Sequence, residues 1–162
     1  GLAFQRRLKD NIRNAPPIVA AIHEIAPVDM GSPRAKGVGS EVCVVQAASS
    51  AGLLPALART VAKLVSGDAA ARRQDVRAEA ISSRAFAGKP RDSVLVARVD
   101  DFKGLERPVV VVAGLGEAAD PASLGMLAYT AYSRANHTLT VVTTEQEAAM
   151  VEALKQARKE VT

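Results

Sequence analysis

Four consecutive valines, Val109–Val112, are the feature that most limits what this chain can fold into. Valine is β-branched and favours extended backbone over helix. A strand that is apolar on both faces is typical of a parallel sheet whose two faces are covered by helices. The segment 109–113 is therefore predicted to be a buried strand near the centre of a parallel sheet.

The remaining segments alternate between strand and helix patterns. Further strands are expected over 41–47, 93–99 and 139–142, and helices between Asn14 and Pro27, over 50–65, over 120–136 and from about 145 onward. Strands that alternate with helices predict an α/β fold with a mostly parallel sheet flanked by helices. A length of 162 residues suits one domain with a sizeable core, so residues 1–162 are expected to form a single domain. The stretch 68–92 carries scattered arginines and only a short apolar piece at Ala80-Ile81, which indicates no clear path.

Two helix starts carry local signals. Asn14 is expected to be the N-cap of the first helix, because asparagine side chains accept hydrogen bonds from the free amides of a first turn. Thr144, followed three residues later by Glu147, matches a capping box at the start of the last helix.

Composition is that of an ordinary globular chain, with 48% hydrophobic and 23% charged residues. No apolar run approaches the roughly 20 residues that span a bilayer, and no signal peptide is apparent, so we expect no membrane partner. The lone Cys43 is expected to be a small buried strand residue, and a chain with one thiol suggests a reducing cytoplasm. No cysteine or histidine is spaced to complete a metal site with His23 or His137. The net charge of +4 permits nucleic-acid binding without requiring it.

Two polar motifs precede β-prone runs. Asp101-Phe102-Lys103-Gly104-Leu105-Glu106 leads into the valine run, and Ala131-Tyr132-Ser133-Arg134-Ala135 comes before the strand at 139–142. Both sets of polar groups should therefore lie at the ends of buried strands. Strand ends are where α/β proteins place their chemistry.

These motifs resemble those of superfamily 1 DNA helicases of the UvrD/Rep type, whose second RecA-like domain contains a "KGLE" turn and a "TRA" or "SRA" helix. A third match, Asn11-Ile12-Arg13-Asn14, resembles the family's "N-x-R-S/N" motif. The three stand in the family's order, and the match spans Leu8 to about Val142. The resemblance implies a RecA-like fold of the P-loop NTPase type, here as the second motor lobe of a larger helicase.

The chain contains no G-x-x-x-x-G-K-[ST] loop of the kind that cradles nucleotide phosphates. In the helicase family, this loop and the metal-binding carboxylates belong to the first RecA-like domain. The resemblance therefore implies ATP with Mg²⁺ bound jointly with an upstream RecA-like domain of the same parent chain. These residues alone are expected to be inactive as an ATPase.

The resemblance also assigns roles to four residues. Arg134 and Arg13 would approach the γ-phosphate when the two lobes close, because a guanidinium stabilises the charge that develops during phosphoryl transfer. Glu106 would accept a hydrogen bond from the ribose, and Gly104 would let the backbone turn tightly beside it. Two structural alternatives stay open: Arg134 as an arginine at a helix C-terminus, and Glu106 as a solvated turn residue.

The chain departs from the family pattern in two places. Ile12 stands where many members carry a tyrosine that stacks on adenine, so an adenine contact is in doubt. Arg98-Val99-Asp100 replaces the "T-x-H" that touches single-stranded DNA in relatives. Arg98 and Lys103 are the candidate DNA contacts, although Asp100 and Asp101 would repel a phosphate backbone.

The sequence is therefore compatible with three functions. The first is the motor lobe of an ATP-dependent DNA helicase that couples hydrolysis to movement on single-stranded or partly duplex DNA. The second is a helicase-like interaction module without ATPase activity. The third is a dinucleotide-binding module, since 114–119 fits the G-x-G-x-x-G/A pattern. Against it, Asp120-Pro121 would start the following helix too late for the glycine turn to open it.

Overall fold

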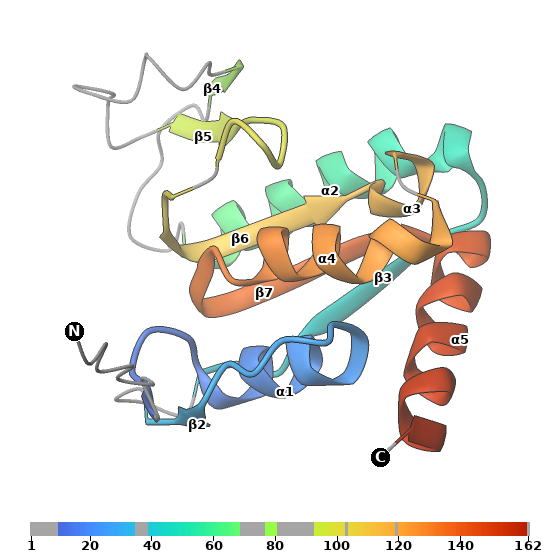
Figure 1. Cartoon of the computed structure of the whole chain (residues 1–162). Coiled ribbons are helices and arrows are strands. Elements are labelled where there is room, and N and C mark those ends of the chain that lie inside the picture. Colours follow the sequence, from blue (N-terminus) through green and yellow to red (C-terminus); the bar gives the residue numbers. More distant parts are fainter. Residues whose placement is uncertain are drawn as a thin grey trace.

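A parallel three-stranded sheet forms the centre of the molecule (Figure 1). The computed structural model describes residues 10–34, 39–68, 77–80, 93–102, 104–118 and 120–161. Within these, the strands lie in the order β3 (Cys43–Ala47), β7 (Ala135–Thr144) and β6 (Arg107–Ala113). Both pairings are parallel, as the alternating pattern predicts.

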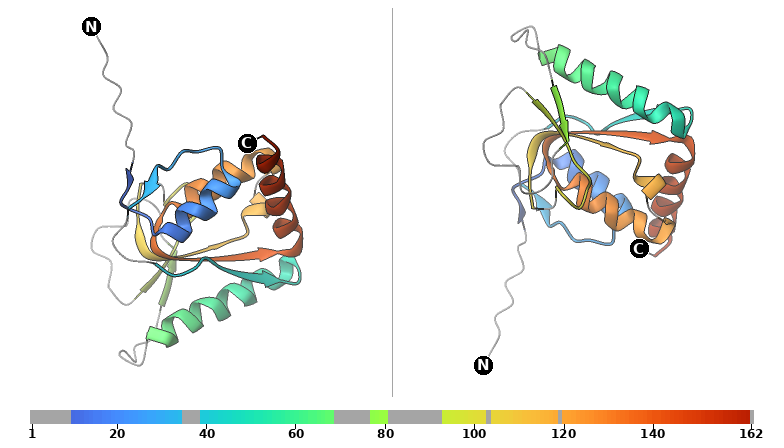
Figure 2. Two further views of the ribbon diagram at one scale, coloured as in Figure 1. Left: turned by 90° about the horizontal axis from the view of Figure 1, so that it is seen from below. Right: turned by 90° about the horizontal axis from the view of Figure 1, so that it is seen from above.

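Helices cover both faces of this sheet (Figure 2). The helices α1 (Pro16–Ile25), α4 (Pro121–Tyr132) and α5 (Glu145–Val161) lie on one face, and α2 (Ser50–Asp68) lies on the other. A short helix, α3 (Leu115–Ala118), follows β6. The larger core cluster is built on the first face and includes Ile18, Ile22, Leu124 and Leu139, and a smaller one lies under α2. The predicted α/β class is confirmed.

Two further strand pairs are short, and both are parallel. β1 (Asp10–Asn11) pairs with β2 (Ser32–Pro33), and β4 (Arg77–Ala80) pairs with β5 (Ser93–Val96). β4 includes Ala80 of the apolar piece noted in the sequence, whereas Ile81 lies outside the described residues. No helix in the described part of the chain is both long enough and apolar enough to cross a membrane.

The valine-rich strand is not central, which corrects the prediction from its composition. β6 pairs only with β7 among the described residues, and Val109 is 49% exposed. The central strand is instead β7, in which every residue from 139 to 144 is buried. Two of its buried threonines have local partners, since the Thr143 hydroxyl donates to the Thr144 carbonyl and the Thr144 hydroxyl accepts from the Glu147 amide. A run of apolar residues therefore indicates that a segment forms a strand, but not whether that strand is central in the sheet.

Several expected boundaries and environments also change. α2 continues through Gly67, which was expected to lie beyond its end, and α4 ends at Tyr132 rather than near 136. Cys43 is exposed because it begins β3, which pairs only with β7 in the described structure, and burial along β3 grows only toward Ala47. The capping box is confirmed, since the Glu147 amide donates to the Thr144 hydroxyl at 3.2 Å.

The first helix has no side-chain cap. Ala15, not Asn14, occupies the N-cap position, and it makes no side-chain hydrogen bond. A missing cap costs a helix about 1 kcal/mol. The Asn14 side chain instead donates hydrogen bonds to backbone carbonyls next to the start of β7.

Two glycines in helices allow a matched test of how closely α4 packs against α1. A Cβ at the buried Gly125 of α4 would lie 2.5 Å from the carbonyl oxygen of Ile25, whereas a Cβ at Gly52 of α2 meets nothing closer than 3.7 Å. We expect Gly125→Ala to lower the free energy of unfolding by about 1–2 kcal/mol, because the overlap outweighs the gain in helix propensity. Gly52→Ala should raise it by up to about 1 kcal/mol. Urea denaturation of both variants checks this, and equal effects would contradict the close approach of α4 to α1.

Candidate functional site

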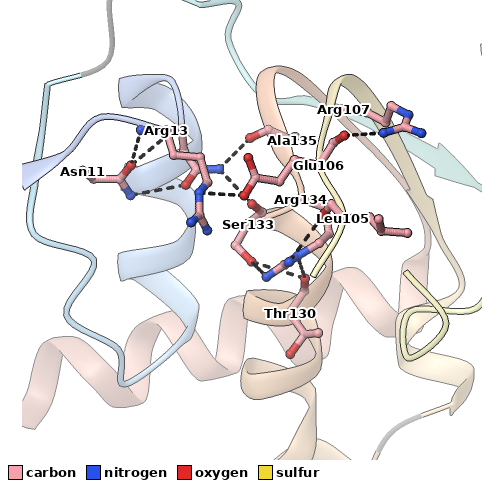
Figure 3. A network of polar contacts seen from close by, with 10 residues as sticks. Asn11, Arg13, Leu105, Glu106, Arg107, Thr130, Ser133, Arg134 and Ala135 are labelled. Atoms are coloured by element: carbon pink, nitrogen blue, oxygen red, sulfur yellow. Dashed lines mark hydrogen bonds and ion pairs between the residues drawn. The ribbon is translucent and has the colours of Figure 1, made fainter. Parts of the chain in front are cut away.

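The three sequence motifs meet at the amino ends of β6 and β7 (Figure 3). The amide of Arg107, at the start of β6, donates to the carbonyl of Arg134 at 3.0 Å, and the amide of Ala15 donates to the carbonyl of Asn136 at 2.9 Å. The polar groups therefore lie at strand ends, as predicted. They lie at the amino ends, however, while open α/β sheets usually bind ligands at the carboxyl ends.

Arg13 is held by a turn before α1 and forms an ion pair with Glu106. The side-chain oxygen of Asn11 accepts hydrogen bonds from the amides of Arg13 and Asn14, both at 3.0 Å. Arg13 Nε then lies 2.7 Å from Glu106 Oε1, and the two side chains are 54% and 31% exposed. An ion pair this exposed contributes about 0–1 kcal/mol to stability. Its main effect is to orient two charged groups toward each other.

A tight turn presents Glu106. Gly104 has a φ of 85°, in the left-handed region where a side chain would be strained, and the Leu105 amide donates to the Phe102 carbonyl at 3.1 Å. Nη1 of Arg107 donates to the Glu106 backbone carbonyl at 2.7 Å. The carboxylate of Glu106 therefore belongs to an ordered contact with Arg13, not to a turn residue that contacts only solvent.

Arg134 lies at the C-terminal end of α4, where its charge faces carbonyl oxygens. Nε donates to the Thr130 carbonyl at 3.0 Å, and Nη2 donates to Ser133 Oγ at 2.9 Å. Nη1 reaches the Leu105 carbonyl of the neighbouring turn at 3.5 Å. The structural alternative, an arginine that interacts with the end of its helix, therefore describes this conformation. The same geometry also brings Arg134 to the turn that carries Glu106.

Asn14 connects these groups, although its local sequence predicted only a helix cap. Its side chain is buried, and Nδ2 donates to the carbonyls of Ser133 at 3.0 Å and Ala135 at 2.6 Å. Its Oδ1 accepts a hydrogen bond from Asn11 Nδ2 at 3.3 Å. The sequence signal for this role is the pair of asparagines, Asn11 and Asn14, on either side of Arg13. Asparagine side chains often form hydrogen bonds with backbone groups. Partners more than a hundred residues away leave no local pattern.

The other predicted residues lie around the same edge or outside the described residues. Ile12 is 76% exposed, next to Arg13. Arg98 and Asp100 are both exposed, and the Arg98 carbonyl accepts the amide of Phe102 at the base of the turn. Lys103 lies outside the described residues. No three metal-ligating side chains gather within the part of the chain that the structure describes.

The carboxyl edge of the sheet contains the glycine pattern of the dinucleotide alternative, but an internal carboxylate occupies it. The long helix α4 begins at Pro121, as predicted, although the four-residue α3 begins at Leu115, directly after Gly114. The backbone amides of Leu115 and Gly116 instead donate to the Glu147 carboxylate. A Cβ at Gly116 would lie 2.6 Å from Glu147 Cγ, so the glycine serves this contact. A pyrophosphate would need the position that Glu147 fills.

Burial raises the pKa of Glu147 above its ordinary value. The residue is 3% exposed, and its Oε2 has no hydrogen-bond partner. Nearby polar groups of Gly116, Thr143, Thr144 and Leu115 lower the pKa of Glu147, but the effect of desolvation is larger.

This shift predicts a pH dependence of stability. Because the pKa of Glu147 is higher in the folded state than its ordinary 4.5, the folded state holds the proton more tightly. The free energy of unfolding should therefore fall as pH rises from about 4.5 through the folded-state pKa. Glu147→Gln should reduce this slope, as measured by denaturant titrations between pH 4.5 and 7. Glu145→Gln, an exposed change in the same helical turn, is the control, and parallel profiles for wild type and Glu147→Gln would refute the assignment.

Comparison with known proteins identifies a shared fold. No protein-family model matches the chain, and no curated protein matches it. Among solved structures, it is similar to the C-terminal domain of a possible DNA helicase from Lactobacillus plantarum WCFS1, with a TM-score of 0.56 and 22% sequence identity. The similarity covers 88% of this chain and 95% of that domain. The match extends over nearly the whole of both chains, so the two share their overall architecture.

Proposed function

We propose that this chain is the second RecA-like lobe of an ATP-dependent superfamily 1 DNA helicase, and that it supplies arginine and ribose contacts to ATP bound against the first lobe. The observation that carries the proposal is the convergence of three separated motifs on one sheet edge. There, Arg13 contacts Glu106 directly and Arg134 reaches the Leu105 carbonyl beside it. The fold shared with a domain of a possible DNA helicase supports it.

Arg134 suits the part of a γ-phosphate contact. Among the described residues Arg134 forms no ion pair. Its guanidinium donates hydrogen bonds only to neutral oxygens. A phosphate offers the planar guanidinium two parallel charge-assisted hydrogen bonds, which are stronger than those to a carbonyl or hydroxyl. An arginine supplied in this way raises the rate of phosphoryl transfer by on the order of 10³ to 10⁵.

Arg13 and Glu106 would exchange partners when nucleotide binds. Each is partly exposed, so separating them costs little. Arg13 would turn to the phosphates, and the Glu106 carboxylate would accept a hydrogen bond from a ribose hydroxyl. The exposed Ile12 offers no hydrogen-bonding group to a base, so this lobe would recognise the phosphates and sugar more than the adenine.

Mg²⁺ and DNA would be held mainly by other parts of the parent protein. The described residues contain no cluster of three metal-ligating side chains, so Mg²⁺ would bind between the ATP phosphates and the first lobe. Arg98 is exposed and, together with Lys103, is the proposed contact to DNA phosphate. Because Asp100 is exposed nearby, this contribution should be small.

ATP hydrolysis by the intact parent protein, with and without single-stranded DNA, tests the proposal. Arg134→Ala should lower DNA-stimulated kcat by on the order of 10³-fold, because the transition-state charge loses its main contact from this lobe. Arg13→Ala should lower kcat less, and Glu106→Gln should chiefly raise the KM for ATP, because it weakens a ground-state contact.

Lys155→Ala provides the matched control, since it removes a cation that pairs with Glu24 at 3.0 Å between α5 and α1. It should leave both kcat and KM unchanged. A folded wild-type parent that hydrolyses no ATP under any condition would refute the motor function. That outcome would favour the interaction module without ATPase activity.

A further inference from the structure

The side-chain amide of Asn14 is hydrogen-bonded to the residues on either side of Arg134 and to Asn11, in the turn that carries Arg13. We propose that Asn14 is a positioning residue that fixes Arg13 and Arg134 relative to each other, so that both can meet one triphosphate. The inference rests on the function proposed above and adds a residue to which the helicase resemblance gave no role. It follows from the contacts, burial and helix geometry around this one side chain.

Asn14 is connected to both arginines through hydrogen bonds to neighbouring residues. Its Nδ2 donates to the carbonyls of Ser133 and Ala135, the residues on either side of Arg134. Its Oδ1 accepts from Asn11, whose own Oδ1 accepts from the Arg13 amide. One planar amide thus connects the backbone that presents Arg134 with the turn that presents Arg13.

Burial makes this connection specific. Asn14 is 1% exposed, so water does not compete for its hydrogen bonds. Only an amide has two donors on one atom and an acceptor on the other, at this length. An aspartate would place acceptor oxygens against two carbonyls, and an alanine would leave both carbonyls without this partner.

The geometry of α1 separates this role from helix capping. Ala15 occupies the N-cap position, so Asn14 lies one residue before it and contributes nothing to the first turn through its side chain. A local cap is absent while two long-range hydrogen bonds are made. The consequence of losing Asn14 should therefore appear in the placement of Arg13 and Arg134.

The first experiment uses the chain itself and does not depend on catalysis. The side-chain Nε–H signals of Arg13 and Arg134 are compared by NMR in wild type, Asn14→Ala and Thr60→Val. Asn14→Ala should shift both signals toward those of a free guanidinium. Thr60→Val removes a buried hydroxyl bonded to the Ala56 carbonyl in α2 and should shift neither. Unchanged signals in Asn14→Ala, or equal shifts in both variants, would overturn the proposal.

The second experiment is a double-mutant cycle in the intact helicase. Asn14→Ala should lower kcat for ATP roughly 10- to 100-fold, the usual consequence of misplacing a catalytic group, with a smaller change in KM. In an Arg134→Ala background it should cost less than about threefold more, because Arg134, the partner relative to which Arg13 is fixed, is already gone. Thr60→Val should have the same small effect in both backgrounds. Full multiplicative loss in the Arg134→Ala background would overturn the proposal.

The two assays also separate the failure of this inference from the failure of the proposed function. A folded parent without ATP hydrolysis refutes the motor, while the NMR signals still decide whether Asn14 positions the arginines. If Asn14→Ala does not fold, Asn14→Ser, which keeps one donor, replaces it in both assays and should give intermediate shifts and rates.

Discussion

The parallel pairing of β7 with both β3 and β6 is the constraint on which the rest of the structure depends. Its register places Ala135 beside Arg107 at one end and Val142 beside Ala113 at the other. The amino end of β7 follows directly from Arg134, and its carboxyl end leads into the α5 turn that carries Glu147. A single buried strand therefore sets the positions of the polar groups at both edges of the sheet.

The two edges differ in how their polar groups are satisfied. At the carboxyl edge, the Glu147 carboxylate takes up the backbone amides of α3 and is almost fully buried. At the amino edge, Arg13 and Glu106 remain partly exposed, and Arg134 contacts only neutral oxygens among the described residues. The Glu147 carboxylate thus occupies the carboxyl edge, whereas Arg13 and Glu106 stay partly exposed at the amino edge, as the proposed nucleotide contact requires.

Sequence patterns predicted which elements form but not how they are arranged. The valine run correctly indicated a strand, but β6 lies beside β7 and only Val112 among its residues is buried, because valine content indicates a preference for extended backbone and not the neighbours of a strand. Asn14 was expected to cap a helix, because the local pattern contains no information about Ser133 and Ala135. The convergence of Arg13, Glu106 and Arg134 followed from the family resemblance, while the ion pair between two of them did not.

Because of that ion pair, the two arginines differ in the charge of the groups that they contact. The charge of Arg13 is already met by a carboxylate at 2.7 Å, while Arg134 is held by a helix carbonyl and a hydroxyl. An approaching phosphate gains a full charge-assisted contact from Arg134 at once, but must compete with Glu106 for Arg13. Because both side chains are partly exposed, water can replace Arg13 at Glu106 at little cost, and a ribose hydroxyl would supply a further donor to the carboxylate. Under the proposed function, the sugar would therefore favour the engagement of Arg13 by the phosphate, so free phosphate should bind less well than a nucleotide.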